Sequence, residues 1–388
     1  MSRRIAVVSV ARSDYGLYRP LLRALAAESA LEPLLIVGAA HLTRQSGDTL
    51  AEIAADGFTP AARVECTLAG DGPASTARAM GLATLNFATA YESLRPDLLV
   101  VLGDRYDMHA AVVAAVPMLI PVAHIAGGAI TRGAIDDGLR HSMTKLSHLH
   151  FPETAAQGAR LRRLGEAGWR VHVTGSLSVD NLAQLPLLDL AAFNRRFGTA
   201  LAGAPVLVTF HPETRDPAGT AAHTEALLAA LDRLPHPLLF TWPNADPAGQ
   251  QIIECLEAFV HARPGRAWAV PHLGTQGYFS AMALARLMAG NSSSGVIEAA
   301  SFGLPVVNVG RRQEGRFAPA NVLHCGYGPD GIAAALARAD SAAFRAEART
   351  VVNPYGDGRA APRMVEVLKT VELGETLLVK ESFDGGTF

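Results

Sequence analysis

Residues 98–105 read Leu-Leu-Val-Val-Leu-Gly-Asp-Arg, and their pattern indicates the fold class. Its five apolar residues do not alternate with polar ones, which is typical of a strand covered on both faces in a parallel sheet. The apolar run stops at Gly103, and two charged residues, Asp104 and Arg105, follow at once. Because parallel sheets bind ligands at the carboxyl ends of their strands, the stretch also points to a functional site.

Similar short apolar runs recur along the chain and alternate with segments of helical period. The expected strands are residues 5–10, 34–38, 98–103, 119–125 and 171–173 in the first half, and 206–210, 237–241, 267–270, 287–290 and 305–309 in the second. Buried strands that alternate with helices predict right-handed βαβ units. The expected fold class is therefore α/β, with two Rossmann-like, doubly wound domains facing a cleft.

The strand and helix pattern is interrupted once, and this interruption divides the chain. We expect an N-terminal Rossmann-like domain over residues 1–180, a linker over 181–204, a C-terminal Rossmann-like nucleotide-binding domain over 205–365 and a C-terminal tail over 366–388. A length of 388 residues is long for one domain and suits two, each with its own core.

Composition and charge argue against several classes of function. The 34 Lys and Arg residues are balanced by 36 Asp and Glu residues, so there is no broad attraction to nucleic acid or to an anionic membrane. The longest apolar stretches are too short or too interrupted by proline for the roughly 20 residues of a membrane span. The first residues resemble a strand more than a signal peptide, so we expect a cytoplasmic protein.

The sequence indicates no cofactor and no metal ion. Cys66, Cys255 and Cys325 lack the spacing of zinc sites and of disulfide scaffolds, so we expect reduced thiols. The 13 histidines are scattered along the chain. The segment after the first expected strand lacks the Gly-x-Gly-x-x-Gly motif of dinucleotide-binding proteins.

The most distinctive local motif is Gly290-Asn-Ser-Ser-Ser-Gly295, between an expected strand and an expected helix. Unpaired backbone N–H groups and the positive end of a helix dipole would favour a phosphate or pyrophosphate near Ser292, Ser293 and Ser294. Glu298, in the first helical turn, would repel a phosphate and is better suited to accept hydrogen bonds from a ribose. Alternatively, the serines only cap the helix.

Charged residues at other strand ends have both a structural and a functional interpretation. Asp104 and Arg105 either form a local cap or take part in the site. Asp136 and Asp137 precede an expected helix, which they either cap or supply with a general acid or base. His211 directly follows a strand, where a histidine suits phosphate binding or proton transfer.

Taken together, these motifs resemble the hydrolysing UDP-N-acetylglucosamine 2-epimerases, bacterial enzymes that supply N-acetylmannosamine or related sugars for sialic-acid-like pathways. The resemblance covers residues 4–370 and rests on several motifs in the same order. They are Ala-Arg-Ser-Asp-Tyr-Gly at 11–16, Gly-Asp-Arg at 103–105, His-Ile-Ala-Gly-Gly at 124–128, Gly-Ala-Ile-Asp-Asp at 133–137 with Arg-His at 140–141 and Thr-Lys-Leu-Ser-His at 144–148, His-Pro at 211–212, Pro-Asn-Ala-Asp at 243–246, and Asn-Ser-Ser-Ser-Gly at 291–295 with Glu298.

The resemblance implies a glycosyltransferase B type of fold, a nucleotide sugar as substrate and a homodimer or homotetramer. In this family the sugar loses its C2 proton as the nucleoside diphosphate leaves C1, and water then adds to the resulting 2-acetamidoglucal with inversion at C2. The residues that match catalytic positions are Asp104, Asp136 and His211, of which His211 also matches a diphosphate contact. Those that match substrate-binding or supporting positions are Arg12, Arg105, His124, Arg140, Ser292, Ser293, Ser294, Gly295 and Glu298.

One loop departs from the family pattern. The family usually reads His-Ile-x-Gly-Gly-Glu, with Glu or His at x, whereas this chain has Ala126 and Ala129 at the two polar positions. If one of the missing side chains is the usual general base, this protein uses another group or acts on another substrate. The alternatives are a divergent nucleotide-sugar or sugar-phosphate hydrolase, lyase or glycosyl-transferring enzyme, and a nucleotide-sugar binding protein without turnover.

Overall fold

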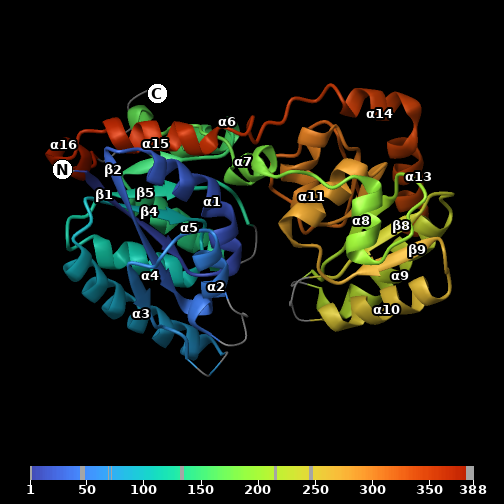
Figure 1. Cartoon of the computed structure of the whole chain (residues 1–388), viewed down its shortest axis with the longest axis horizontal. Helices are drawn as coiled ribbons and strands as arrows, with labels where there is room; N and C mark the ends of the chain where they lie inside the picture. The colour runs from blue at the N-terminus through green and yellow to red at the C-terminus, as the bar shows by residue number, and fades with distance from the viewer. Residues whose placement is uncertain are drawn as a thin grey trace. The chain divides into compact units, whose positions relative to one another are not determined.

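The computed structural model describes residues 2–43, 49–68, 70, 72–131, 135–213, 216–243 and 248–381. The chain divides into two compact units, the first comprising residues 1–181 and 355–388 and the second residues 182–354 (Figure 1). Each unit has its own parallel sheet and its own hydrophobic core. The predicted α/β class with two Rossmann-like sheets is therefore confirmed.

In the described part of the first unit, six parallel strands form one sheet in the order β3-β2-β1-β4-β5-β6. The strands are β1 (Arg3–Ser9), β2 (Leu31–Gly38), β3 (Ala62–Val64), β4 (Leu98–Leu102), β5 (Val122–Ile125) and β6 (Leu149–Phe151). The helices are α1 (Arg12–Ala27), η1 (Ala39–Leu42), α2 (Thr49–Ala55), α3 (Pro73–Leu94), α4 (Tyr106–Ala115), α5 (Ile135–Leu146), α6 (Ala155–Arg163), η3 (Gly168–Arg170), α15 (Ala360–Thr370) and α16 (Glu375–Leu378).

The chain passes into the second unit within α7 (Leu177–Gln184). There, among the described residues, six parallel strands follow the order β12-β11-β10-β7-β8-β9. The strands are β7 (Val206–Thr209), β8 (Leu238–Thr241), β9 (Ala267–Val270), β10 (Leu287–Gly290), β11 (Val306–Val309) and β12 (Val322–Cys325). The helices are α8 (Leu190–Phe197), η4 (Pro217–Gly219), α9 (Thr220–Asp232), α10 (Gly249–His261), α11 (Gly274–Leu284), α12 (Ser294–Ile297), η5 (Ala299–Phe302), α13 (Pro329–Asp340) and α14 (Ala342–Ala348).

The central strands are apolar throughout because both faces of each sheet are covered. In β1, Ile5 and Val7 belong to one hydrophobic cluster, whereas Ala6 and Val8 belong to another. Successive side chains of a strand point to opposite faces, so β1 supplies both cores of the first unit at once. No helix within the described ranges is long and apolar enough to cross a bilayer.

The sequence predicts the central strands better than the edges. It predicts a strand over residues 171–173, but there only Val171 pairs, in an isolated bridge with His150. It does not predict the edge strands β3 and β12, which are short and include exposed residues, so they lack a continuous apolar run.

The two units differ in extent from the predicted domains. Helix α8 lies in the predicted linker (181–204), yet its Phe193 is fully buried in the core of the second unit. Helix α15 was expected partly in the C-terminal domain (205–365) and partly in the tail (366–388), yet Met364 and Leu368 complete the core of the first unit against α1. In Figure 1 the red α15 lies among the blue and green elements of the first unit. Each helix belongs to the unit whose sheet covers the apolar face of that helix.

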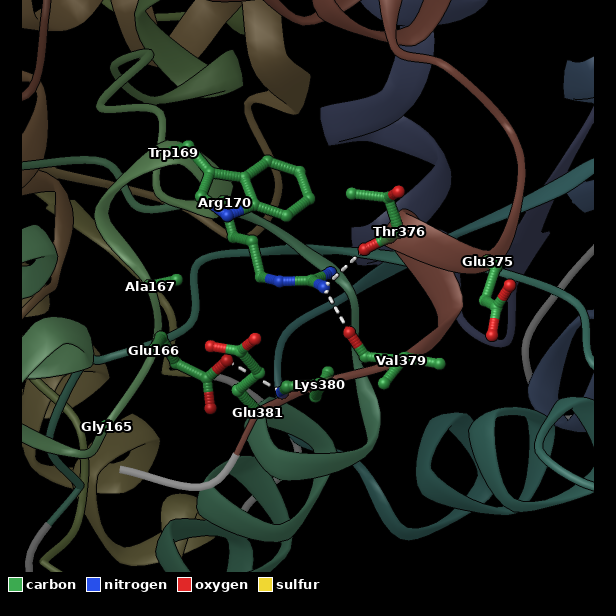
Figure 2. Close-up of a pocket in the computed structure, with 10 residues that line it drawn as sticks. All are labelled: Gly165, Glu166, Ala167, Trp169, Arg170, Glu375, Thr376, Val379, Lys380 and Glu381. Carbon is green, nitrogen blue, oxygen red and sulfur yellow. Dashed lines mark hydrogen bonds and ion pairs between the residues drawn. The ribbon is translucent and has the colours of Figure 1, made fainter. Parts of the chain in front are cut away.

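The segment after α15 is fixed to the first unit by Arg170, as Figure 2 shows. The guanidinium group donates to the carbonyl oxygens of Thr376, Leu377 and Val379 at distances between 2.7 and 3.0 Å. These oxygens belong to the short helix α16 and to the residue that ends it, where carbonyl groups lack partners within the helix. The buried Arg170 side chain therefore holds α16 and Val379 against the first unit.

Lys380 strengthens this attachment through a buried carboxylate. Its Nζ atom lies 2.6 Å from Glu166, which also contacts Lys145 at 2.8 Å and His150 at 2.9 Å. Burial alone would raise the pKa of Glu166, but hydrogen bonds from His150, Lys145 and Lys380 outweigh burial and lower it to about 2. Together with Arg170, Glu166 and Lys380 line a hollow of about 370 Å³ (Figure 2).

Replacement of Glu166 by Gln should lower the free energy of unfolding of the first unit by about 3 kcal/mol at pH 7, because it leaves Lys145 and Lys380 without their carboxylate. The folded-state pKa of about 2 lies below the ordinary 4.5. The stabilisation is therefore complete above pH 4.5 and is lost as the pH falls toward 2. Urea unfolding should give a constant difference between the wild type and Glu166→Gln from pH 7 to pH 5 and a shrinking one below pH 4.5.

The matched control is Glu28→Gln, which removes the carboxylate partner of Lys369 at the surface of the same unit. It should change the unfolding midpoint far less than Glu166→Gln does. Equal effects of the two substitutions, or a difference from the wild type that stays constant below pH 4.5, would contradict the assigned role of Glu166.

Candidate active site

The carboxyl ends of the strands in the first unit lie at one edge of its sheet, because the paired strands run parallel. Since β1, β4 and β5 are neighbours, the loops that follow them are brought together. Arg12 begins the helix after the β1 loop, Asp104 lies in the loop after β4, and the described part of the segment that leads to α5 follows β5.

Asp104 lies in the loop after β4, and Arg140 from α5 binds its carboxylate. The same guanidinium group donates to the hydroxyl of Thr131 at 2.8 Å. Arg140 is buried, whereas the Asp104 side chain is 21% exposed. The ion pair therefore holds a carboxylate at the strand edge and leaves part of it accessible to a ligand.

His124, at the end of β5, binds the backbone of the loop that carries Asp104. Its side chain is fully buried, and its Nε2 lies 2.7 Å from the carbonyl oxygen of Gly103, the residue before Asp104. Burial lowers the pKa of His124 to about 4, so the imidazole is neutral at pH 7. A carbonyl can only accept, so Nε2 carries the proton. His124 thus ties the end of β5 to the start of the Asp104 loop and makes no direct contact with solvent.

The two aspartates at the start of α5 are not equivalent. Asp137 accepts a hydrogen bond from the backbone N–H of Thr131 at 2.8 Å and lies 3.6 Å from Arg140. The Asp136 carboxylate, by contrast, has no hydrogen bond or ion pair with another residue in the described part of the chain. Asp137 is therefore bound to Thr131 and Arg140 rather than shown as a cap of α5, whereas the Asp136 carboxylate is the less constrained of the two.

Arg12 and Arg105 are paired with carboxylates in this structure. Arg12 lies 3.1 Å from Glu52 of α2, with more than half of its side chain exposed. Arg105 makes two hydrogen bonds to the fully buried Asp107, at 3.0 and 3.2 Å. Arg105 therefore stabilises the start of α4, whereas the exposed Arg12 can exchange its carboxylate for another anion.

The loop with the two alanines begins with an unusual backbone. Ala126 has a φ of 62°, in the left-handed region that residues with a Cβ atom rarely adopt. Gly128 follows with a φ of 76°, and a Cβ atom there would lie 2.7 Å from the carbonyl oxygen of Gln157. The loop is therefore bent tightly against α6, and neither Ala126 nor Ala129 contributes an acid or a base.

In the second unit, the side chain of Asn291 joins the ends of β7 and β10. Its Oδ1 accepts from the backbone N–H of His211 at 2.7 Å, and its Nδ2 donates to the His211 carbonyl oxygen at 2.9 Å. The close approach of the two strands requires Gly290, because a Cβ atom there would lie 2.1 Å from the carbonyl oxygen of Thr209. His211 and the serine loop are thereby held at one strand edge.

Two residues that sequence reasoning did not single out belong to the same edge. Arg312 and Gln313 follow β11, and both donate to the carbonyl oxygen of Asn291, at 3.3 and 2.8 Å. Burial and the positive charge of Arg312 lower the pKa of His211 to about 3. At pH 7, His211 is therefore a neutral hydrogen-bonding group, and Arg312 supplies positive charge. The strand-end argument that selects Asp104 also applies to Arg312 and Gln313.

The serine loop differs from its prediction in one respect. The expected helix after Ser292–Ser294 is a single turn, α12, followed by the 3₁₀ turn η5. Ser293 occupies the N-cap position, but its side chain makes no capping hydrogen bond. A single turn sums few peptide dipoles, so the hydroxyl and N–H groups of the loop have more influence on a bound anion than a helix dipole has.

Two residues that follow the serine loop, Gly295 and Glu298, are buried. Gly295 packs against β11, where a Cβ atom would lie 2.9 Å from Val306. Glu298 is buried directly after α12.

Residues 133–134 and 244–246, which carry part of the family motifs, lie outside the described residues. Among the residues that are described, no group of three His, Cys, Asp or Glu side chains is arranged to hold a metal ion.

Comparison with known proteins identifies relatives over most of the chain. A profile of the family described as UDP-N-acetylglucosamine 2-epimerase matches residues 23–369. A GDP/UDP-N,N'-diacetylbacillosamine 2-epimerase (hydrolyzing) of Campylobacter jejuni is 36% identical over 322 residues, or 83% of this chain and 84% of the relative. A UDP-N,N'-diacetylbacillosamine 2-epimerase (hydrolyzing) of Legionella pneumophila is 33% identical over 98% of this chain and 99% of its own.

Solved structures agree on the fold. The UDP-GlcNAc 2-epimerase from Neisseria meningitidis, bound to UDP-GlcNAc, has a TM-score of 0.80 at 17% identity and covers 94% of this chain and 99% of its own. The enzyme from Methanocaldococcus jannaschii, in complex with UDP-GlcNAc and UDP, has a TM-score of 0.73 at 16% identity, over 94% of this chain and 99% of its own. The profile match and the identities together show that this chain belongs to the UDP-N-acetylglucosamine 2-epimerase family.

Proposed function

We propose that this protein is a hydrolysing 2-epimerase that converts a nucleoside-diphosphate N-acetylhexosamine and water into the free 2-epimer of the sugar and the nucleoside diphosphate. The family membership and the two relatives named as hydrolysing 2-epimerases support this reaction. They do not favour the alternative of a divergent hydrolase, lyase or glycosyl-transferring enzyme.

We further propose UDP-N,N'-diacetylbacillosamine as the preferred substrate. The relatives that are named for this compound are 36% and 33% identical to the chain, whereas a UDP-N-acetylglucosamine 2-epimerase of Neisseria meningitidis is 25% identical. Ala126 and Ala129 fit this choice, because two small apolar side chains leave room for a second N-acetyl group on the sugar. Both of the more similar relatives are named for UDP, and the one from Campylobacter jejuni is named for GDP as well.

The chemistry requires carboxylates on the sugar and cations on the diphosphate. The C2–H bond next to an acetal carbon is hardly acidic, so a base removes the proton while the C1–O bond breaks and the electron pair leaves with UDP. Water then adds its hydroxyl group to C1 of the glycal, and an acid delivers a proton to C2 from the opposite face. The product is the free sugar with inverted C2.

The observation that carries this assignment is the carboxylate of Asp104, fixed by Arg140 at the strand edge beside the helix that bears Asp136. We assign the acid and base steps to Asp104 and Asp136, with His124 and Arg140 as supports. Arg105 acts through Asp107 on the same loop region. The expected general base of the His-Ile-x-Gly-Gly-Glu loop is then replaced by an aspartate.

The nucleotide contacts are assigned to the second unit and to Arg12. His211, as a neutral donor, and Arg312 would bind the diphosphate, which charge-assisted hydrogen bonds hold well. The remaining proposed contacts are Ser292, Ser293, Ser294 and Gly295 for the diphosphate and Glu298 for the ribose. A cytoplasmic location and a homodimer or homotetramer remain predictions. Light scattering of the purified protein measures its oligomeric state.

The reaction itself is tested by incubating the protein with UDP-N,N'-diacetylbacillosamine in heavy water. We expect release of UDP together with a free sugar that carries one deuterium at C2, detected by NMR, because the proton returned to C2 comes from solvent. UDP-N-acetylglucosamine should react more slowly. Cleavage without deuterium at C2 would contradict the elimination mechanism, and the absence of turnover with both substrates would contradict the proposed function.

The division of roles between the two strand edges predicts opposite kinetic effects. Asp104→Asn should lower kcat by about 10²–10⁴-fold with little change in UDP affinity, because it removes an acid or base. Ser292→Ala should weaken UDP binding by about tenfold with a smaller change in kcat, because it removes a donor to a phosphate. Steady-state kinetics and calorimetry measure the two effects.

Two conservative variants serve as controls for these substitutions. Asp137→Asn keeps an oxygen that can accept from the Thr131 backbone N–H next to Asp136 and should retain turnover. Ser301→Ala removes a hydroxyl that contacts only Asn353 among the described residues and should leave UDP affinity unchanged. Interchanged effects of Asp104→Asn and Ser292→Ala would refute the assignment of their roles.

A further inference from the structure

A chain of buried hydroxyl groups runs through the second unit and ends at the serine loop. The hydroxyl oxygens of Thr241 and Thr209, at the ends of β8 and β7, lie 2.7 Å apart. Thr209 lies 3.1 Å from the hydroxyl of Tyr278 in α11, and Tyr278 lies 3.5 Å from Ser292 Oγ. Four hydroxyls from four different segments are thus connected, and none of the motifs found in the sequence includes Thr209, Thr241 or Tyr278.

The number of hydroxyl protons in this series of four side chains restricts the direction of the hydrogen bonds between them. Each hydroxyl has one proton to donate. Ser292 Oγ already accepts from the backbone N–H of Ser294 at 3.3 Å. If Tyr278 also donates to Ser292, both acceptor positions of Ser292 are filled, and its own proton must point away from the chain. Tyr278 then accepts from Thr209, and Thr209 accepts from Thr241, so each of the three hydrogen bonds between these four hydroxyls has one donor and one acceptor.

Tyr278 is suited to be the donor in this arrangement. Burial raises the pKa of Tyr278 above its ordinary value near 10, so the phenol keeps its proton at pH 7. Ser292 is only 9% exposed, so few positions are open to the proton that it turns away from Tyr278. An anionic oxygen next to Ser292 would accept a hydrogen bond from this outward-pointing hydroxyl, in the direction that the chain already favours.

We propose that Tyr278 is a positioning residue: its hydroxyl orients the Ser292 hydroxyl as a donor to a phosphate oxygen of the nucleotide. This inference rests on the proposed function, in which Ser292 contacts the diphosphate. We call the connected hydroxyls of Thr241, Thr209, Tyr278 and Ser292 the relay. It has a physical advantage over an isolated serine, because the direction in which Ser292 donates is set before the ligand arrives and because connected hydroxyls polarise one another.

A purely structural role predicts a different result. In that case the hydroxyl chain only satisfies buried polar groups, and removal of the Tyr278 hydroxyl would lower stability without distinguishing between ligands. In the relay, the same removal frees the Ser292 proton to rotate inward, so binding of a diphosphate suffers and binding of the nucleoside alone does not.

The test is Tyr278→Phe, which keeps the ring and removes only the hydroxyl. We expect the Kd of UDP, measured by calorimetry, to rise about fivefold to tenfold. The Kd of uridine, measured by ligand-observed NMR, should not change. Thr209→Val, which has nearly the same shape and removes the donor to Tyr278, should weaken UDP binding in the same direction but less.

Two comparisons make the result decisive. Tyr91→Phe removes the hydroxyl of a fully buried tyrosine in the first unit, where it donates to the Ala111 carbonyl oxygen, and should leave UDP affinity unchanged. In a double-mutant cycle, Tyr278→Phe should have no further effect on UDP binding once Ser292 is alanine, because both substitutions then act on one hydrogen bond.

The possible failures are distinguishable. If Ser292→Ala leaves UDP affinity intact, the proposed diphosphate contact fails. If Ser292→Ala weakens UDP binding but Tyr278→Phe does not, the relay alone is overturned. Equal losses of uridine and UDP affinity in Tyr278→Phe, or full additivity with Ser292→Ala, would overturn it as well. Thermal unfolding of each variant, followed by circular dichroism, identifies any variant that fails to fold.

Discussion

Strands that are buried on both faces leave no room for polar side chains along their length, and parallel pairing sends every strand end of one direction to the same edge. This constraint is met in both units and decides where chemistry can occur. Asp104 follows β4, His211 follows β7 and the serine loop follows β10. The support for these residues also comes from the sheets, since His124 and Asn291 each join two neighbouring strand ends. The site residues therefore directly follow paired strands, and the strand pairing fixes the position of their backbone.

The fold was predictable where apolar runs are continuous and was not predictable where they are broken. The runs of β1 and β4 identify central strands because both faces of each need apolar side chains. Edge strands need them less, so β3 and β12 gave no signal. The location of α15 could not be predicted for another reason. Its apolar face fits any exposed sheet surface, and only the three-dimensional structure shows that it covers the first unit.

The candidate site also has a part that the sequence could predict and a part that it could not. Strand-end position and residue type were enough to suggest Asp104, His211 and the serines, although the family resemblance was needed to give them roles. Partners that come from elsewhere in the chain were beyond sequence reasoning. Arg140 was expected to contact substrate, and nothing in its helical segment indicates that it binds Asp104. In the sequence, Tyr278 looks like any aromatic residue of an apolar helix, and only the structure shows its hydroxyl beside Thr209. Such contacts depend on folding and have no local pattern.

The return of α15 to the first unit affects the order in which the chain can mature on the ribosome. The strands of that unit are translated at the start, but Met364 and Leu368, which close its core, emerge only near the end. The second unit is continuous in sequence and can condense as soon as it leaves the exit tunnel. Domains usually mature in the order in which they are made. Here the half that is synthesised first is completed last, and its uncovered apolar surface persists throughout the translation of its neighbour.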